Sequence, residues 1–470
     1  MNTTHAPLPG RLVMVGCGSI GQAVMPLVLR HLAIAPERIS ILTGDARGRS
    51  MAEHYGISFT EIRLTRDNLR DVLVPRLEPG DFLLNLSVDV ASTAMVRIAR
   101  ECGAFYLDTC IEPWLGAYTD PSLSASERSN YRLREQMLAL QRELGAGPTA
   151  VVAQGANPGL VSQFVKAAAT ILAKDLGRDP TPPTDRAGWA RLMNDLGVKA
   201  IHIAERDTQV AAVSKRVGEF VNTWSVDGFI SEGVQPAELG WGTHERHFPR
   251  EGGRHDGGCG SAIYLNRPGA GTRVRTWTPL EGPFHGFLVT HNESISIADY
   301  LTLEEGGRVV YRPTVHYAYH PCDDAVLSLH EMAGKNWAPQ TEHRLMMDEI
   351  TTGVDELGVL LLGHPKGAFW YGSQLSVEEA REVVPFNNAT SLQVAAGVLG
   401  GMVEALEKPD QGIVEAEALD HTRVLEVAGP YLGPVVGAYS AWTPLDGRGR
   451  LFPEDVDAAD PWQFKNVLVS

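Results

Sequence analysis

The 470-residue sequence has few cysteines, no long apolar run and no excess of positive charge. Its five cysteines are scattered and odd in number, which favours a reducing cytoplasm over a disulfide-bonded secreted fold. No uninterrupted apolar stretch reaches the roughly 18 residues of a membrane helix, and the N-terminal segment lacks a signal-peptide pattern. A net charge of −16 opposes binding to nucleic-acid phosphates. We therefore expect a cytoplasmic globular protein with neither a nucleic-acid nor a membrane partner.

Short apolar runs alternate with amphipathic ones along the first 160 residues, beginning with RLVMVG and SIGQAVMPLVLRHL. Such a βαβ series predicts an α/β fold with a Rossmann-type, doubly wound parallel sheet covered by helices on both faces. We expect this first domain to span residues 1–160, with a contribution from a later helix at about 387–410.

Extended segments separated by turns replace this pattern from about residue 198, as in VKAIHIAERDTQ and NTWSVDG. They predict a second, α+β domain over 161–470 with a mixed or antiparallel sheet. We expect this domain to carry the substrate site. The glycine-rich stretch at 249–260 is predicted to be irregular.

A dinucleotide fingerprint, GCGSIG, follows the first apolar strand and opens the first helix. Gly16 permits a tight turn, Gly18 lets a pyrophosphate approach the backbone, and Gly21 allows close helix–strand packing. Ser19 and Ile20 belong to the same turn, at the helix N-terminus that faces the negative charge.

The acidic partner expected at the end of the second strand is Asp45, which lies 29 residues beyond Gly16. The usual spacing is about 20 residues, so the first helix and its loop must be longer. Asp45 would bind ribose hydroxyls and favour NAD, whereas Arg47 and Arg49 could instead accept the 2′-phosphate of NADP. Further strand ends at the same sheet edge supply candidate cofactor contacts: Asn85, Ser87, Asp108, Thr109 and Cys110.

Carboxylates gather around Trp224 in a segment that is otherwise apolar enough to be partly buried. Glu232 follows it closely, and Glu205 ends the apolar face of the strand that also carries Ile201 and Ile203. An indole face attracts cations, so the pattern predicts a cationic ligand. The competing interpretation of Trp224 is a core aromatic.

His291 and Glu293 fall on one face of VTHNESISIAD if this stretch is a strand. Two titratable groups on an otherwise apolar face form a candidate acid–base pair, with a core histidine beside a solvated glutamate as the alternative. Zinc-type ligands also occur close together, but no Cys-x-x-Cys pair accompanies them and we predict no metal site. These ligands are His244, His247, His255 and Cys259.

Three long motifs resemble the bacterial homospermidine synthases: NTWSVDGFISEGVQPAELGWGTHE, GANPGLVS and THNESISIADYL. The resemblance covers essentially the whole chain, and the layout is more distantly similar to saccharopine dehydrogenase-like reductases. It implies a homodimer that uses NAD as a prosthetic group to join two putrescines, or putrescine and spermidine, into sym-homospermidine with release of ammonia.

The resemblance also implies residue roles. Trp224 would stabilise an iminium, Glu205 and Glu232 would hold ammonium groups, His291, Glu293 and Glu112 would position amines and move protons, and Asn157 and Pro158 would lie beside the nicotinamide. It leaves open which group is the base, and whether Asp89 or Asp355 joins the acidic set.

Two other functions fit the residues. A saccharopine dehydrogenase-like or carboxynorspermidine-type imine reductase would consume NAD(P)H stoichiometrically and would need a basic residue for a substrate carboxylate. A non-catalytic sensor of NAD and polyamines would need neither His291 nor a base.

The resemblance predicts that Trp224→Ala lowers turnover of putrescine, because the iminium loses its cation–π contact, while NAD stays bound. Turnover and NAD content of the purified variant check this. A parallel loss of NAD binding would contradict the assignment.

Overall fold

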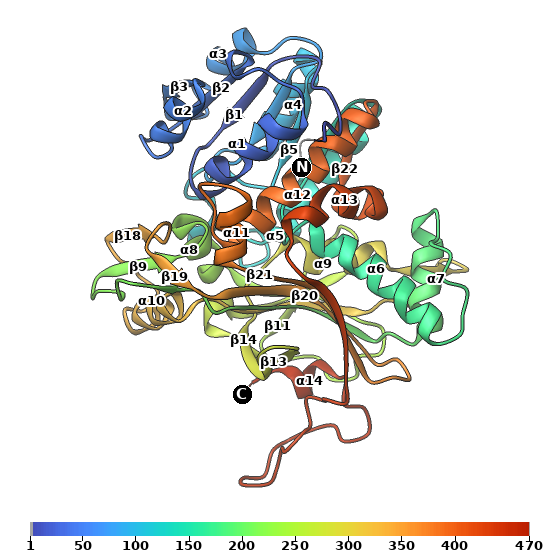
Figure 1. Cartoon of the computed structure of the whole chain (residues 1–470). Helices are drawn as coiled ribbons and strands as arrows, with labels where there is room; N and C mark the ends of the chain where they lie inside the picture. The colour runs from blue at the N-terminus through green and yellow to red at the C-terminus, as the bar shows by residue number, and fades with distance from the viewer. Residues whose placement is uncertain (1–2, 470) are drawn as a thin grey trace.

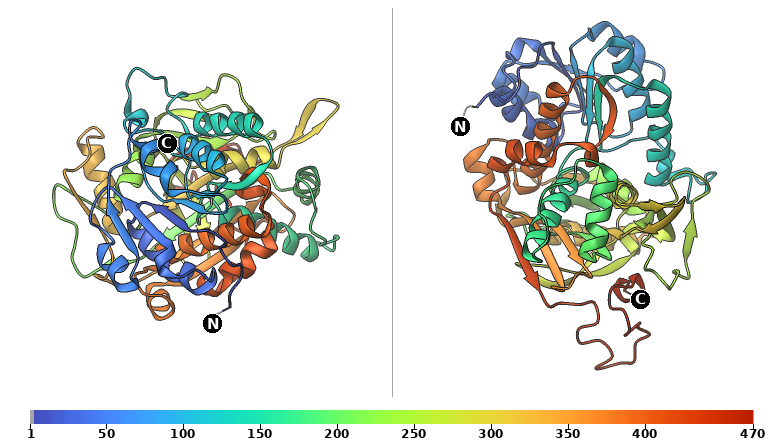
Figure 2. Two further views of the ribbon diagram at one scale, coloured as in Figure 1. Left: turned by 90° about the horizontal axis from the view of Figure 1, so that it is seen from above. Right: turned by 90° about the vertical axis from the view of Figure 1, so that its right-hand side faces the viewer.

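The computed structural model describes residues 3–469 and contains two large sheets, one above the other in Figure 1. Helices α6 (Leu160–Asp175), α9 (Asn292–Tyr300) and α12 (Ala389–Glu407) lie in the layer between them. Figure 2 shows the same two-tiered arrangement from the side. The predicted α/β class with a parallel sheet and a second mixed sheet is confirmed.

The upper sheet has seven parallel strands in the order β22-β6-β5-β4-β1-β2-β3. Its inner strands are buried on both faces, as their continuous apolar sequences require. The strands are β1 (Leu12–Val15), β2 (Ile39–Thr43), β3 (Ser58–Glu61), β4 (Phe82–Asn85), β5 (Phe105–Asp108), β6 (Gly147–Val152) and β22 (Gln411–Glu415).

Helices pack on both faces of this sheet. One face receives α12 from late in the chain, which packs against α1 and contacts β5 and β6. The other face receives α4 and α5. The helices between these strands are α1 (Ser19–His31), α2 (Arg49–Tyr55), α3 (Leu69–Leu73), α4 (Ser92–Cys102) and α5 (Asn130–Leu144).

The lower sheet is mixed, with the path β11-β12-β10-β17-β7-β20-β21-β23 and the pair β13–β14 attached to β17. Strands β7 and β17 run parallel, whereas β20 and β21 pair antiparallel. The strands are β7 (Ala200–Asp207), β10 (Pro236–Gly240), β11 (Gly252–Arg254), β12 (Ala262–Pro268), β13 (Arg273–Thr278), β14 (Gly282–Phe287), β17 (Thr314–His320), β20 (Val354–Leu362), β21 (Ala368–Ser376) and β23 (Val435–Ser440).

Short elements complete the part of the chain that is built on the lower sheet, which we call the second unit; the part built on the parallel sheet, with α12, is the first. The helices are α7 (Arg186–Leu196), α8 (Val226–Val234), α10 (Asp323–Gly334), α11 (Val377–Val383), α13 (His421–Ala428) and α14 (Phe464–Val467). The two-stranded sheets pair β8 (Val210–Ala211) with β19 (Ile350–Thr352), β9 (Glu219–Asn222) with β18 (Glu342–Leu345), and β15 (Leu303–Glu305) with β16 (Arg308–Tyr311).

Three sequence predictions are wrong. The stretch with His291 and Glu293 is not a strand: helix α9 begins at Asn292, and eight of its nine residues are buried, so its apolar pattern has no helical period. The segment around Trp224 was predicted to be extended, but Ser225 caps helix α8, which begins at Val226. The glycine-rich stretch contains a short strand, β11.

Helix α12 is, among the described residues, the one helix long and apolar enough to cross a membrane. Within that helix, 89% of the apolar window is buried inside the protein. Its apolar character is therefore accounted for by its place between the two sheets.

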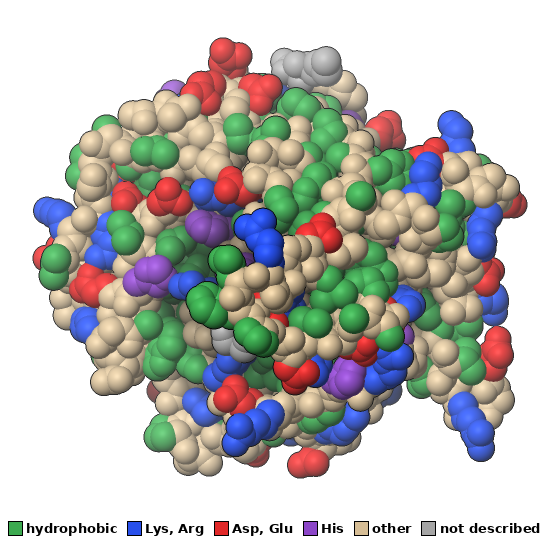
Figure 3. All heavy atoms as spheres, turned by 90° about the horizontal axis from the view of Figure 1, so that it is seen from below, with side chains coloured by type: hydrophobic (Ala, Val, Ile, Leu, Met, Phe, Trp, Pro, Cys, Tyr) green, Lys and Arg blue, Asp and Glu red, His purple; other side chains and the backbone are tan. Residues whose placement is uncertain are grey.

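The face of the lower sheet that points away from the parallel sheet is covered partly by the C-terminal segment, residues 441–469. Figure 3 shows hydrophobic side chains near the middle of this face among charges of both signs. Phe464 and Val467 fill a small core with residues of β10, β12 and β13.

Gly397 allows α12 to approach the loop after β6 closely, since a Cβ there would lie 1.9 Å from the Gly155 carbonyl oxygen. We expect Gly397→Ala to lower the free energy of unfolding by about 1–3 kcal/mol in urea titrations. Gly334→Ala, also in a helix but with no heavy atom within 4 Å of its Cβ, is the matched control and should be neutral or stabilising. An equal effect of both substitutions would contradict the close approach.

Candidate active site

A cavity of about 670 Å³ lies at the carboxyl edge of the parallel sheet. The glycine-rich turn and the ends of β2 and β4 line one part of it, and Trp224, Asp227 and Leu345 of the second unit line the other. Both units of the chain therefore line the cavity.

The glycine-rich turn fits a pyrophosphate. Gly16 has φ +90°, and a Cβ there would lie 2.5 Å from the Leu86 carbonyl oxygen, so only glycine fits this turn. A Cβ on Gly18 would meet no heavy atom within 4 Å, which leaves its backbone open to a ligand. Ser19 Oγ is buried at the N-terminus of α1 without a hydrogen-bond partner in the described chain. Together with Ile20 this turn forms an anion cradle.

Asp45 lies at the end of β2 and lines the cavity, as predicted. Its carboxylate accepts hydrogen bonds from Arg47, with 2.7 Å from Nη2 to Oδ2, and these bonds lower the pKa of Asp45. Arg47 also lines the cavity, whereas Arg49 pairs with Glu61. Of the two arginines weighed for a 2′-phosphate, only Arg47 reaches this space.

The other predicted cofactor contacts divide into two groups. Ser87 lines the cavity. Asn85 and Asp108 are buried and bond inside the protein: Tyr106 lies between them, and Asp108 Oδ1 accepts from the Ala153 N–H at 2.7 Å. Burial raises the pKa of Asp108 to about 6. Thr109 and Cys110 follow β5 and are partly exposed.

An aromatic stack extends from the cavity into the second unit. Trp224 Nε1 donates to the Tyr319 hydroxyl at 3.2 Å. The ring of Tyr319 stacks on that of Tyr317, with centroids 5.1 Å apart and an angle of 7° between the planes. His291 lies 4.3 Å from the Tyr317 ring. Trp224 thus connects the cavity to a buried polar cluster.

Glu205 is the centre of that cluster. Its Oε2 accepts from Tyr317 at 2.5 Å and from Asn157 Nδ2 at 2.7 Å. Asn157 precedes the buried Pro158, to which it is joined by a cis peptide. Burial raises the pKa of Glu205 to about 7, and the charge of nearby Asp207 adds to the rise.

His291 lies between two carboxylates. Its Nε2 is 3.1 Å from Glu232 Oε2, and its Nδ1 is 3.1 Å from Glu293 Oε1. Burial alone would lower the pKa of His291, but Glu293 and Glu232 outweigh burial and hold the pKa well above its usual value. The two carboxylates therefore favour the protonated imidazole.

More buried acids surround these residues. Burial raises the pKa of Glu112 to about 8, and nearby Asp89 and Glu232 add to the rise. Burial also raises the pKa of Asp207 to about 6 and that of Asp355 well above its usual value. Asp89 lines the cavity.

Among residues 3–469, no lysine or arginine forms a hydrogen bond or ion pair with any of six buried or half-buried carboxyl groups, those of Glu112, Glu205, Asp207, Glu232, Glu293 and Asp355. Their one cationic partner in this part of the chain is His291. The cluster therefore has a deficit of positive charge in a low-dielectric environment, which a cationic ligand would remove.

Not every carboxylate near Trp224 in sequence joins the cluster. Glu219 pairs with Arg344, and Glu245 accepts from Thr314 Oγ1 and the Phe464 N–H. Glu238 accepts from the backbone at the start of α5. These three groups form contacts within the fold and not with the cluster.

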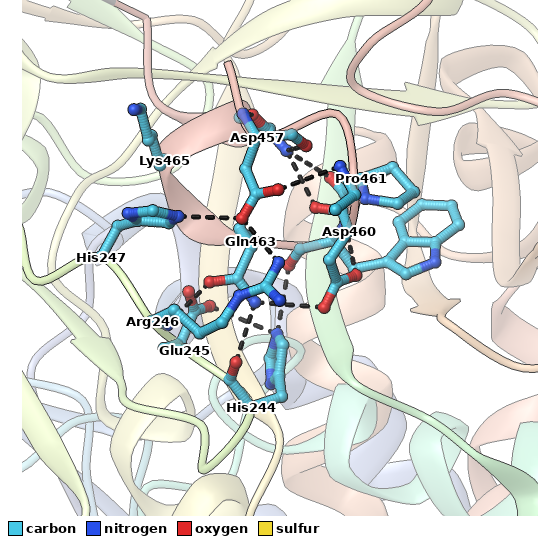
Figure 4. Close-up of polar contacts among 12 residues, drawn as sticks. His244, Glu245, Arg246, His247, Asp457, Asp460, Pro461, Gln463 and Lys465 are labelled. Atoms are coloured by element: carbon cyan, nitrogen blue, oxygen red, sulfur yellow. Dashed lines mark hydrogen bonds and ion pairs between the residues drawn. The ribbon is translucent and has the colours of Figure 1, made fainter. Parts of the chain in front are cut away.

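The zinc-type ligands lie in two separate parts of the second unit. Figure 4 shows His244 and His247 beside the C-terminal segment, where His244 contacts the Trp462 carbonyl and His247 contacts Asp457. His255 stacks on Tyr131, and Cys259 lies near Arg134. The described residues contain no group of three or more potential ligands.

Tyr317 and Tyr319 contact the predicted site residues but were not themselves predicted as site residues. Both lie on β17, two residues apart and therefore on one face, and Tyr319 is in register with Glu205 on β7. The i, i+2 spacing in VHYAY was the available signal, but it could not show that β17 is the neighbour of β7.

Two family domains match nearly the whole chain: the saccharopine dehydrogenase NADP binding domain at residues 12–151 and the saccharopine dehydrogenase C-terminal domain at 155–438. The homospermidine synthase of Blastochloris viridis is 58% identical over 467 residues, covering 98% of each chain. The chain belongs to the homospermidine synthase family. The homospermidine synthase of Mesorhizobium japonicum is 52% identical and covers 99% of this chain and 97% of its own.

A solved homospermidine synthase, from Legionella pneumophila in complex with NAD, superposes with a TM-score of 0.92 at 47% identity, covering 98% of each chain. Saccharopine dehydrogenase from Saccharomyces cerevisiae has a TM-score of 0.51 at 10% identity, covering 92% of this chain and 100% of its own, and shows the fold alone. The resemblance to homospermidine synthases stated from the motifs is thus confirmed.

The raised pKa of Glu205 predicts a pH-dependent stability difference for Glu205→Gln. The folded protein holds the Glu205 proton up to about pH 7, whereas an ordinary glutamate loses it near 4.5, so the ionised side chain destabilises the fold progressively between these values. The glutamine keeps an acceptor for Asn157 and Tyr317. In urea titrations it should stabilise the protein by on the order of 2–3 kcal/mol at pH 8 and by little below pH 5.

Glu53→Gln, at an exposed glutamate, is the control and should show no such trend. A Glu205→Gln difference that is independent of pH would contradict the buried, unpaired carboxylate.

Proposed function

We propose that this chain is an NAD-dependent homospermidine synthase that joins two putrescines, or putrescine and spermidine, into sym-homospermidine and releases ammonia. The observation that carries the proposal is the buried carboxyl cluster, which has no lysine or arginine partner among the residues that the structure describes and lies next to a cavity with a dinucleotide cradle. A diammonium ligand supplies the positive charge that this cluster lacks.

The carboxylates hold the substrate's ammonium groups. Glu205 and Glu232 are separated by Tyr317 and His291, which contact each other, so a flexible diamine chain can meet a carboxylate on either side. Trp224 forms the wall shared with the cavity. A cation on its face gains about 0.5–2 kcal/mol, more as water is excluded.

Proton transfer needs a base that is ionised at neutral pH yet takes a proton readily. Burial brings the pKa of Glu205 to about 7 and that of Glu112 to about 8, so a bound cation, which lowers both pKa values, is needed to ionise them fully at neutral pH. Once ionised, either carboxylate can take the ammonium proton, which must leave before the adjacent carbon can give up a hydride.

The protonated His291 serves as the acid. Held between Glu232 and Glu293, it can protonate the departing amine so that ammonia leaves. When bound, NAD supplies an acceptor for the hydride and returns it later, so no net redox change results. Asn157, bonded to Glu205, would lie beside the nicotinamide.

We also propose that residues 1–160 with α12 bind NAD, that 161–470 bind the polyamine and form a homodimer, and that the protein acts in the cytoplasm. The free state of all five cysteines supports a reducing compartment. The cation-poor cluster argues against a saccharopine-type reductase, which would need a basic side chain for the substrate carboxylate.

Incubation with putrescine and a trace of NAD tests the function. Because the hydride is returned, we expect homospermidine and ammonia in equal amounts, far exceeding the NAD supplied, by mass spectrometry and an ammonia assay. A reductase would stop once the cofactor is consumed, and a sensor would bind putrescine without forming product. Either result would overturn the proposal, and His291→Asn provides the low-activity control.

A further inference from the structure

Helix α5 belongs to the parallel-sheet unit but contacts the helix that begins after His291. The N-terminus of α5 receives the carboxylate of Glu238 from strand β10. Oε2 of Glu238 accepts from the Asn130 N–H at 2.7 Å, and Oε1 accepts from the Tyr131 N–H at 3.3 Å. A carboxylate is stabilised at this end of a helix by the helix dipole.

Thr290, the residue before His291, shares this anchor. Its hydroxyl donates to Glu238 Oε2 at 2.6 Å and accepts from Asn130 Nδ2 at 3.0 Å. Glu238 and Thr290 are fully buried, so water does not compete for these bonds. The backbone that leads into His291 is thereby bonded to α5.

A second anchor holds the other end of α9. Arg134 of α5 is only 2% exposed, and its Nη2 donates to Asp299 Oδ2 at 2.8 Å. The same guanidinium binds Glu415 at the end of β22 with two hydrogen bonds of 2.6 and 2.8 Å. Two charges are therefore paired inside the protein by one arginine, which fixes their relative position.

Between these anchors α9 has little freedom. Both ring nitrogens of His291, its N-cap residue, lie 3.1 Å from carboxylate oxygens, those of Glu293 in the first turn and Glu232 in α8. A small shift of α9 relative to α8 would lengthen the contact between His291 and Glu232 while leaving the one to Glu293 intact.

We propose that Thr290, Glu238 and Arg134 are positioning residues that fix α9 on α5 and so hold His291 against Glu232. The inference rests on the proposed function, in which His291 acts as the acid. None of the three residues lines the cavity. They act through His291, and α5 thereby ties the acid to the unit that carries the glycine-rich turn.

The test compares Thr290→Val with Thr290→Ser. Valine keeps the volume and removes the hydroxyl, whereas serine keeps the hydroxyl. We expect kcat to fall about 10- to 100-fold for valine, because the acid is misplaced, with KM for putrescine and NAD content nearly unchanged. Serine should restore most of the activity.

Thr149→Val is the matched control, since Thr149 is equally buried and its hydroxyl bonds the Lys408 carbonyl at the far edge of the parallel sheet. It should cost stability without lowering kcat. A loss of kcat in this control equal to that of Thr290→Val, or failure of serine to restore activity, would show a merely structural role.

A double-mutant cycle with His291→Asn completes the test. If Thr290 acts through His291, Thr290→Val should have almost no further effect on kcat in the His291→Asn protein. Additive losses would overturn the inference. Arg134→Lys keeps the charge but cannot bridge both Asp299 and Glu415, so it too should lower kcat in the native protein and have almost no further effect in the His291→Asn protein. This variant replaces Thr290→Val in the cycle if Thr290→Val does not fold.

The outcomes for the function and for the positioning role are distinguishable. An unsubstituted chain that forms no homospermidine refutes the function, whereas an active chain with additive losses refutes only the positioning role.

Discussion

The rest of the site depends on buried carboxyl groups that, within residues 3–469, form no hydrogen bond or ion pair with a lysine or arginine. Placing ionised groups in a low-dielectric interior is unfavourable, and the fold responds by raising their pKa values, to about 7 for Glu205 and about 8 for Glu112. Protons occupy the sites when no cation is present. The same groups are therefore binding sites for ammonium and acceptors for its proton.

Much of the fold could be predicted because local pattern and tertiary environment agree. The inner strands of the seven-stranded sheet are continuously apolar and buried on both sides, and Gly16 and Gly21 lie where packing leaves no space for a side chain. Strand β22 was not predicted: QGIVE is short, and only pairing with β6 makes it a strand. The parallel sheet needs both this strand and α12, which arrive long after its first six strands.

The candidate site could be predicted only in part. Residues named by a motif, such as Trp224 and His291, are linked in the structure through Tyr319 and Tyr317. The strand predicted around His291 was wrong because a helix that is buried on all sides shows no amphipathic period, and the sequence SISI alternates as a strand does. Tyr317 and Tyr319 were missed because their role depends on which strand neighbours β7, a long-range property that local patterns do not contain.

The late arrival of β22 and α12 has a consequence for biosynthesis. As the polypeptide leaves the ribosome, the first six parallel strands appear with an open edge at β6 and with the apolar flank of α1 uncovered. Some two hundred and fifty residues must follow before that edge is paired. During this interval the nascent chain exposes surfaces that favour association with other chains, and it is a natural client for chaperones.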